Sequence, residues 1–153
     1  MTSVADNRDR GIDVEDESCG QWPLEPAAED RSEWFDLVAV DRYNAIGQSV
    51  EAGDRLECKS CWDRYGSRRG RWWIPRRNYK RLVENDGWYI LSVVDREAEY
   101  ILWISLVRAS RIDQLIDGRW TDCGRGGKGV EQYRQLPWSA VFDPAETPGG
   151  GRA

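Results

Sequence analysis

Histidine is absent from the 153-residue chain. Its absence excludes Ser-His-Asp and Cys-His catalysis, together with every metal site that needs an imidazole ligand. Acid–base chemistry must therefore come from carboxylates, lysine, tyrosine or cysteine. The chain also lacks an apolar run long enough to span a bilayer and an N-terminal signal-peptide pattern, so we expect a cytoplasmic protein with no membrane partner.

Lysine is scarce, and the charge is unevenly distributed. The net charge is -5, and arginine far outnumbers lysine, a bias typical of a salt-adapted, halophilic organism with a GC-rich genome. Residues 1–33 hold ten acidic residues against three arginines. The acidic, aliphatic-poor start predicts a disordered arm over residues 1–31. We expect one small domain over 32–143 and a flexible Gly- and Pro-rich tail over 144–153.

The middle of the chain alternates between strand and helix patterns. Apolar runs predict strands at residues 34–40, 55–61, 88–94 and 100–107, the last two forming a hairpin. Helices are expected at 76–86, directly after Pro75, and at 110–118, with Ser110 as the N-cap. This order of elements is typical of a mixed α/β domain.

The strand predicted at 55–61 carries a Glu-x-Lys pattern. Side chains alternate between the two faces of a strand, so Glu57 and Lys59 point the same way and Cys58 points the other way. Asp36 lies in the preceding predicted strand. If these two strands pair, Asp36 and Glu57 come within reach of one metal ion. Two carboxylates, a backbone carbonyl and waters suit Mg²⁺, and Lys59 would orient a water and offset phosphate charge.

An acid, a gap of about twenty residues and Glu-x-Lys, here "FDLVAVDR…RLECKSC" followed by "RRNYKRL" and "WYILSVV", resembles the PD-(D/E)XK nuclease superfamily. The pattern looks most like the small archaeal type related to Holliday junction resolvases and restriction endonucleases. The resemblance covers residues 34–107. It implies a restriction-endonuclease-like α/β fold, in which a mixed central sheet is flanked by helices, and a metal-dependent DNA endonuclease or resolvase-like activity.

The resemblance also implies roles for individual residues. Asp36, Glu57 and the backbone carbonyl of Cys58 would be metal ligands for Mg²⁺, with Mn²⁺ as an alternative ion. Lys59 would be the catalytic lysine. The helix after Glu-x-Lys would add a polar or basic group, from Arg77 or Lys80. Resolvases of this family act as dimers, so a homodimer is a further expectation.

Three alternatives remain open at this level, and one of them is a halophilic scaffold or interaction protein whose tryptophan and arginine surface meets another protein. Glu57 and Lys59 also fit a solvent-facing ion pair, with Asp36 as an ordinary turn or edge residue. The chain also departs from the family, because no helix pattern with an acid precedes Asp36, and only Glu29 or Glu33 could substitute. The second alternative is therefore a non-catalytic nucleic-acid-binding module with a degenerate nuclease fold.

A basic segment between residues 64 and 83 contains no acid. Arginine pairs with phosphate oxygens and aromatic rings stack on bases, so this segment predicts contact with nucleic acid, DNA above all. The alternative is a solvated helix face whose arginines pair with the acidic arm. The residues expected to contact nucleic acid are Arg68, Arg69, Arg71, Trp72, Arg76, Arg77, Lys80 and Arg81.

The cysteines do not predict a zinc site. Cys58 and Cys61 have the Cys-x-x-Cys spacing, but they lie on a predicted strand and would face opposite sides of it. Cys58 is expected to be a small buried residue facing away from Glu57.

Overall fold

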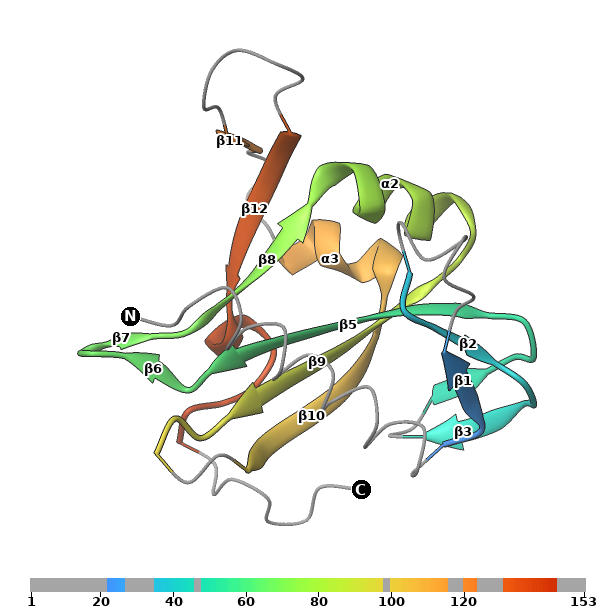
Figure 1. Cartoon of the computed structure of the whole chain (residues 1–153), viewed down its shortest axis with the longest axis horizontal. Helices are drawn as coiled ribbons and strands as arrows, with labels where there is room; N and C mark the ends of the chain where they lie inside the picture. The colour runs from blue at the N-terminus through green and yellow to red at the C-terminus, as the bar shows by residue number, and fades with distance from the viewer. Residues whose placement is uncertain are drawn as a thin grey trace.

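The centre of the protein is a mixed five-stranded sheet in the order β1-β2-β5-β9-β10 (Figure 1). The structure is a computed structural model, and it describes residues 22–26, 35–45, 48–97, 100–115, 120–123 and 131–145. The strands of this sheet are β1 Leu24–Pro26, β2 Leu37–Ala39, β5 Arg55–Trp62, β9 Trp88–Val94 and β10 Ile101–Arg108.

The strand directions follow from the connections. β1, β2 and β5 pair antiparallel, and β9 pairs antiparallel with β10. β5 and β9 pair in parallel, and the chain between them contains a helix, as a parallel crossover requires. All residues of β9 are buried, as expected for a central strand covered on both faces.

Both described helices pack on the same face of the sheet. Helix α2 (Arg76–Glu84) contributes Tyr79 and Leu82 to the larger apolar core, and α3 (Ala109–Leu115) contributes Ile112. Neither helix, in the part of the chain that the structure describes, is long and apolar enough to cross a membrane.

Helix α2 has sharply defined ends. Pro75 occupies its N-cap position with φ -67°. At the other end Gly87 donates its N–H to Leu82 O, and a Cβ at Gly87 would lie 2.8 Å from the Arg55 carbonyl oxygen. The helix can therefore turn into β9 only because residue 87 has no side chain.

Among the described residues, three smaller sheets accompany the central one. The pairs are β3 (Tyr43–Ala45) with β4 (Gln48–Val50), and β6 (Arg64–Tyr65) with β7 (Arg68–Arg69). A three-stranded sheet runs in the order β11-β12-β8, with β11 at Thr121–Cys123, β12 at Glu131–Pro137 and β8 at Arg71–Pro75. A 3-10 turn, η2 (Trp138–Ala140), follows β12.

Most of the expected elements are present. The strand at 55–61, the helix after Pro75 and the hairpin of β9 and β10 are confirmed. The strand expected at 34–40 is shorter, at 37–39, and α3 begins at Ala109 rather than after a cap at Ser110. The small strands between residues 64 and 75 were not expected, because a run of arginines hides their strand pattern.

The acidic arm expected over residues 1–31 is wrong at Leu24–Pro26. These residues form the edge strand β1, and Leu24 is buried in the smaller apolar core with Leu37 and Leu56. Residues 1–21, the glycine-rich stretch 124–129 and the tail from residue 146 lie outside the described residues.

Candidate functional site

The pairing of β2 with β5 brings Asp36 beside Glu57. Asp36 donates its N–H to Leu56 O at 2.9 Å, and its Oδ2 accepts the N–H of Cys58 at 2.8 Å. The Asp36 carboxylate is thereby fixed to the backbone on the C-terminal side of Glu57. Burial raises the pKa of Glu57, and the negative charge of Asp36 raises it further.

Glu57 is a buried acid, with a relative exposure of 5%. Its Oε1 lies 3.4 Å from Lys59 Nζ and accepts the Asn78 side-chain N–H at 3.3 Å. Its Oε2 is buried with no hydrogen-bond partner. The reading of Glu57 and Lys59 as a solvent-facing pair is therefore wrong, although the ion pair itself is present.

Burial dominates the electrostatics of this site. It raises the pKa of Glu57 above its usual value of 4.5, and the Asp36 charge adds to the increase. The Lys59 ammonium and the hydrogen bond from Asn78 act in the opposite direction. An ionised Glu57 with one unpartnered oxygen next to a second carboxylate is costly, and a bound cation would offset that cost.

The donor set fits a hard divalent cation. Two neighbouring carboxylates, one with a buried unpartnered oxygen, are ligands that Mg²⁺ or Mn²⁺ accepts when backbone carbonyls and waters complete the shell. Among the described residues no group of three His, Cys, Asp or Glu could hold a metal. The role of the Cys58 carbonyl stays a prediction, and Glu29 and Glu33 lie outside the described residues.

Two neighbours of Glu57 were not anticipated. The expected contributors from α2 were Arg77 or Lys80, but the contact is made by Asn78. Helical spacing could have found it, because Asn78 lies four residues before the buried Leu82 and so shares its inward face. Tyr89 is in register with Glu57 on β9, and its buried hydroxyl has no hydrogen-bond partner. Burial and the nearby Glu57 charge raise the pKa of Tyr89.

The expected nucleic-acid residues fall into two groups. Arg77, Lys80 and Arg81 are exposed on α2, the helix that also carries Asn78. Arg68, Arg69 and Arg71 are exposed on β7 and β8. Arg76 is half-buried, donates to the Gln132 side chain and lies over the Trp120 ring at 5.9 Å.

The expectation for Trp72 is wrong. Its side chain is fully buried in the larger core, and its indole N–H donates to Ser92 O at 2.9 Å. Strand alternation in β8 instead turns Trp73 outward, where it is 49% exposed and stacks on Tyr133 with ring centroids 4.2 Å apart. The exposed aromatic of this segment is the neighbour of the expected one.

The carboxylates and the arginines of the β6–β7 hairpin are separated along β5. The β6–β7 hairpin follows the C-terminal end of β5, and β2 lies beside its N-terminal end (Figure 1). Asp63 lies six residue steps after Glu57, which corresponds to roughly 20 Å at about 3.3 Å per residue. The carboxylates and the hairpin arginines therefore lie beside opposite ends of β5.

The cysteines behave as expected. Cys58 and Cys61 are buried thiols. They belong to different apolar cores on the two faces of the sheet, so they cannot share a metal ion. Cys19 and the side chain of Cys123 lie outside the described residues.

The fold and the carboxylate–lysine arrangement define a nuclease-like α/β domain. A family model for the PD-(D/E)XK nuclease superfamily domain matches residues 1–143. The chain belongs to the PD-(D/E)XK nuclease superfamily, which implies a nucleic-acid substrate and nuclease-like activity. Comparison with curated proteins and with solved structures gave no match. The matched range includes β1 and the residues before it, so the acidic N-terminal segment is part of the family domain.

Proposed function

We propose that this protein is a metal-dependent DNA endonuclease that hydrolyses phosphodiester bonds at Asp36, Glu57 and Lys59. The observation that carries the proposal is the buried Glu57 carboxylate, which has a lysine on one oxygen and no partner on the other, beside Asp36. A purely structural ion pair would not need a second carboxylate at this position. A site that collects negative charge around one open oxygen suits a divalent cation.

Each side chain has a distinct task in this proposal. Asp36 and Glu57 would hold Mg²⁺ or Mn²⁺, which when bound polarises the phosphate and lowers the pKa of a water. Lys59, at 3.4 Å from Glu57, would orient that water and offset the charge that develops on the phosphate. Asn78 fixes the rotamer of Glu57 through its hydrogen bond.

Helix α2 would position the DNA strand that is cut. It carries Asn78 toward the carboxylates and exposes Arg77, Lys80 and Arg81 to solvent. These cations would neutralise phosphates next to the reacting one and add salt-sensitive affinity. The resemblance to Holliday junction resolvases makes branched DNA the first substrate to test, with a homodimer as the expected assembly.

A non-catalytic nucleic-acid-binding module is the second candidate. It is favoured by one observation, which is that the described residues supply two acids rather than three at the expected metal position. A cation held by two carboxylates and waters binds more weakly than one held by three. The same basic surface would then bind nucleic acid without cutting it.

A cleavage assay separates these candidates. Labelled linear, supercoiled and four-way-junction DNA would be incubated with the protein in Mg²⁺, Mn²⁺ or EDTA, in high potassium. We expect metal-dependent cutting that falls by about a thousandfold or more in Glu57→Gln and Lys59→Ala. Glu84→Gln is the matched control, since Glu84 is an exposed acid on α2. Binding without cutting in every metal would establish the binding module instead.

A further inference from the structure

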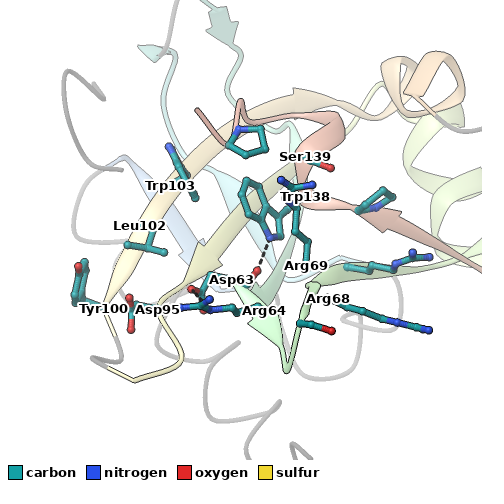
Figure 2. A pocket seen from close by; sticks show the side chains of 14 residues that line it. Asp63, Arg64, Arg68, Arg69, Asp95, Tyr100, Leu102, Trp103, Trp138 and Ser139 are labelled. Carbon is teal, nitrogen blue, oxygen red and sulfur yellow. Dashed lines mark hydrogen bonds and ion pairs between the residues drawn. The ribbon is translucent and has the colours of Figure 1, made fainter. Parts of the chain in front are cut away.

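A groove lies at the end of β5 opposite the carboxylates. It has a volume of about 930 Å³ and is lined by both polar and apolar side chains. Figure 2 shows Arg64, Arg68 and Arg69 on the hairpin side, with Tyr100 and Leu102 at the start of β10 across from them. The size lies within the range of sites that take small organic ligands, on the order of 300–1,000 Å³.

The groove is held in shape by contacts between distant segments. The Trp138 indole N–H donates to Asp63 O at 2.7 Å, and the Trp138 backbone N–H donates to Gly70 O at 3.2 Å. A Cβ at Gly70 would lie 1.8 Å from the Trp62 carbonyl oxygen, so the β6–β7 hairpin closes tightly against β5. The Trp138 ring also packs against Trp103, with centroids 4.9 Å apart. The groove is thus formed before any ligand arrives.

The groove is positive. Arg64, Arg68, Arg69 and Arg71 line it against two acids, Asp63 and Asp95. Asp63 is already engaged, because its Oδ2 lies 3.9 Å from Arg64 and its Oδ1 accepts the Arg96 N–H. Within the described residues, no carboxylate forms an ion pair with Arg68 or Arg71. An excess of guanidinium groups in a groove favours an anionic ligand, and phosphate oxygens match the guanidinium fork.

One exposed aromatic ring lines the groove and another lies beside it. Tyr100 lines the groove and is 56% exposed. Arg71 and its cross-strand partner Pro137 also line it, and alternation along β8 places Trp73, which is outside the lining, on the same outward face as Arg71. Trp73 is already stacked on Tyr133, and the pair is nearly coplanar at 8°. The surface therefore combines arginines with exposed aromatic rings.

We propose that this groove binds unpaired nucleotides, so that the protein recognises DNA carrying a single-stranded segment. Arginines and solvent-facing rings together select single strands, because a ring can stack only on a base that is not already stacked inside a duplex. A duplex would use the arginines and leave Tyr100 and Trp73 without a function. The ligand is assigned by this combination of charge and aromatic surface.

The position of the groove predicts a distance between the bound single-stranded segment and the point of cleavage. This prediction rests on the proposed function. The groove lies roughly 20 Å from Glu57 along β5, at about 3.3 Å per residue. With a rise of 3.4 Å per nucleotide step, that distance spans about six steps of duplex. The groove would hold the unpaired segment while the carboxylates cut the adjoining duplex about six nucleotides away.

Binding is tested with the full-length Glu57→Gln variant in EDTA, so that cleavage does not interfere. Fluorescence anisotropy would compare a blunt duplex, the same duplex with a single-stranded tail, and the tail alone. We expect the tailed DNA to bind about tenfold more tightly than the blunt duplex. Adding Tyr100→Ala together with Trp73→Ala should remove most of that preference and leave blunt-duplex binding unchanged, because neither ring can stack on a paired base. Tyr100→Phe together with Trp73→Phe should restore the preference, because a phenyl ring still stacks.

The matched control is Arg111→Ala, which removes an exposed arginine on α3 outside the groove. Equal affinity for blunt and tailed DNA, or an unchanged preference in the groove variants, would overturn the proposal. The two proposals fail differently. A preference for tailed DNA without cleavage by the wild type would contradict the proposed nuclease activity and support the proposed groove. Cleavage of blunt duplex with no preference for tailed DNA would support the proposed nuclease activity and contradict the proposed groove.

Discussion

The charges at the two ends of β5 differ in sign and in burial. At the N-terminal end, Glu57 is buried and negative, stands next to Asp36 and has an unpartnered oxygen. At the C-terminal end, Arg68 and Arg71 stand in an open groove where water screens their charge. Burial makes the first region sensitive to every charge and hydrogen bond around it, whereas exposure makes each charge in the second region worth little alone.

Under the two proposals, the buried end of β5 carries the chemistry and the open end carries the recognition. Charge at the buried end is concentrated in a few groups, so each should be individually essential. Charge and aromatic surface at the open end are distributed over several groups, so affinity should depend on their sum. Three experiments, in addition to the cleavage and tail-binding measurements, test this contrast.

The largest expected effect is a difference in the free energy of unfolding between substitutions of two adjacent tryptophans. Trp72→Ala should lower the free energy of unfolding by about 3–5 kcal/mol, because it opens a cavity in the core and leaves the Ser92 carbonyl without its donor. Trp73→Ala should cost about 1 kcal/mol or less in stability, because its ring is half exposed. Urea unfolding followed by circular dichroism measures both, and equal losses would contradict the in–out alternation of β8.

The next effect concerns how the charge of Glu57 changes the free energy of unfolding with pH. The pKa of Glu57 is raised in the folded, metal-free chain, so protonation stabilises the fold and its contribution is fully present below the unfolded value of about 4.5. That contribution is lost as the pH rises through the raised value. Glu57→Gln keeps the neutral shape, so it should be more stable than the wild type at pH 8 by about 1–3 kcal/mol in EDTA.

Urea unfolding at pH 5 and pH 8 measures this difference. It should shrink as the pH is lowered, because a raised pKa favours protonation of the wild-type carboxyl. Glu84→Gln, which changes an exposed acid on the same helix as Asn78, should show no comparable trend. Adding Mg²⁺ or Mn²⁺ at pH 8 should stabilise the wild type and leave Glu57→Gln unchanged. A wild type as stable as Glu57→Gln at pH 8 without metal would show that the buried charge carries no cost.

The smallest effect is expected on the exposed face of α2. Single changes Arg77→Ala, Lys80→Ala and Arg81→Ala should each weaken duplex binding uniformly across sequences. Each should also reduce the slope of log affinity against log salt by about one. Titrations of blunt duplex at several potassium concentrations measure that slope, with Arg111→Ala as the reference. Slopes that stay at the wild-type value would mean that α2 does not face the phosphate backbone.

Local patterns were sufficient for the strand that carries the site and for the helix beside it. Alternation along residues 55–61 puts Glu57 and Lys59 on one face, and the structure pairs their charged groups at 3.4 Å. Pro75 marks the start of α2 because it fixes φ and needs no N–H partner. The separation of Cys58 from Cys61 follows from the same alternation. These features depend only on neighbours in the chain.

Other features depended on how the elements pack. The phase of β8, and with it the choice of Trp72 as core and Trp73 as surface, was set by pairing with β12, which lies about sixty residues later. Leu24–Pro26 look like part of an acidic arm and become a strand only because β2 offers an unpaired edge. Asn78 contacts Glu57 only because α2 packs against the sheet beside β5.

The sequence by itself determined the family, the strand with Glu57 and Lys59 and the helix that follows it, since these rest on short-range periodicity and one local motif. The tertiary structure alone decided that Glu57 is buried with one open oxygen, and that the hairpin arginines meet Tyr100 and Trp138 in a groove. Those arrangements join segments that lie far apart in the chain. The free energy of such contacts comes from burial and packing, which no local pattern in the chain encodes.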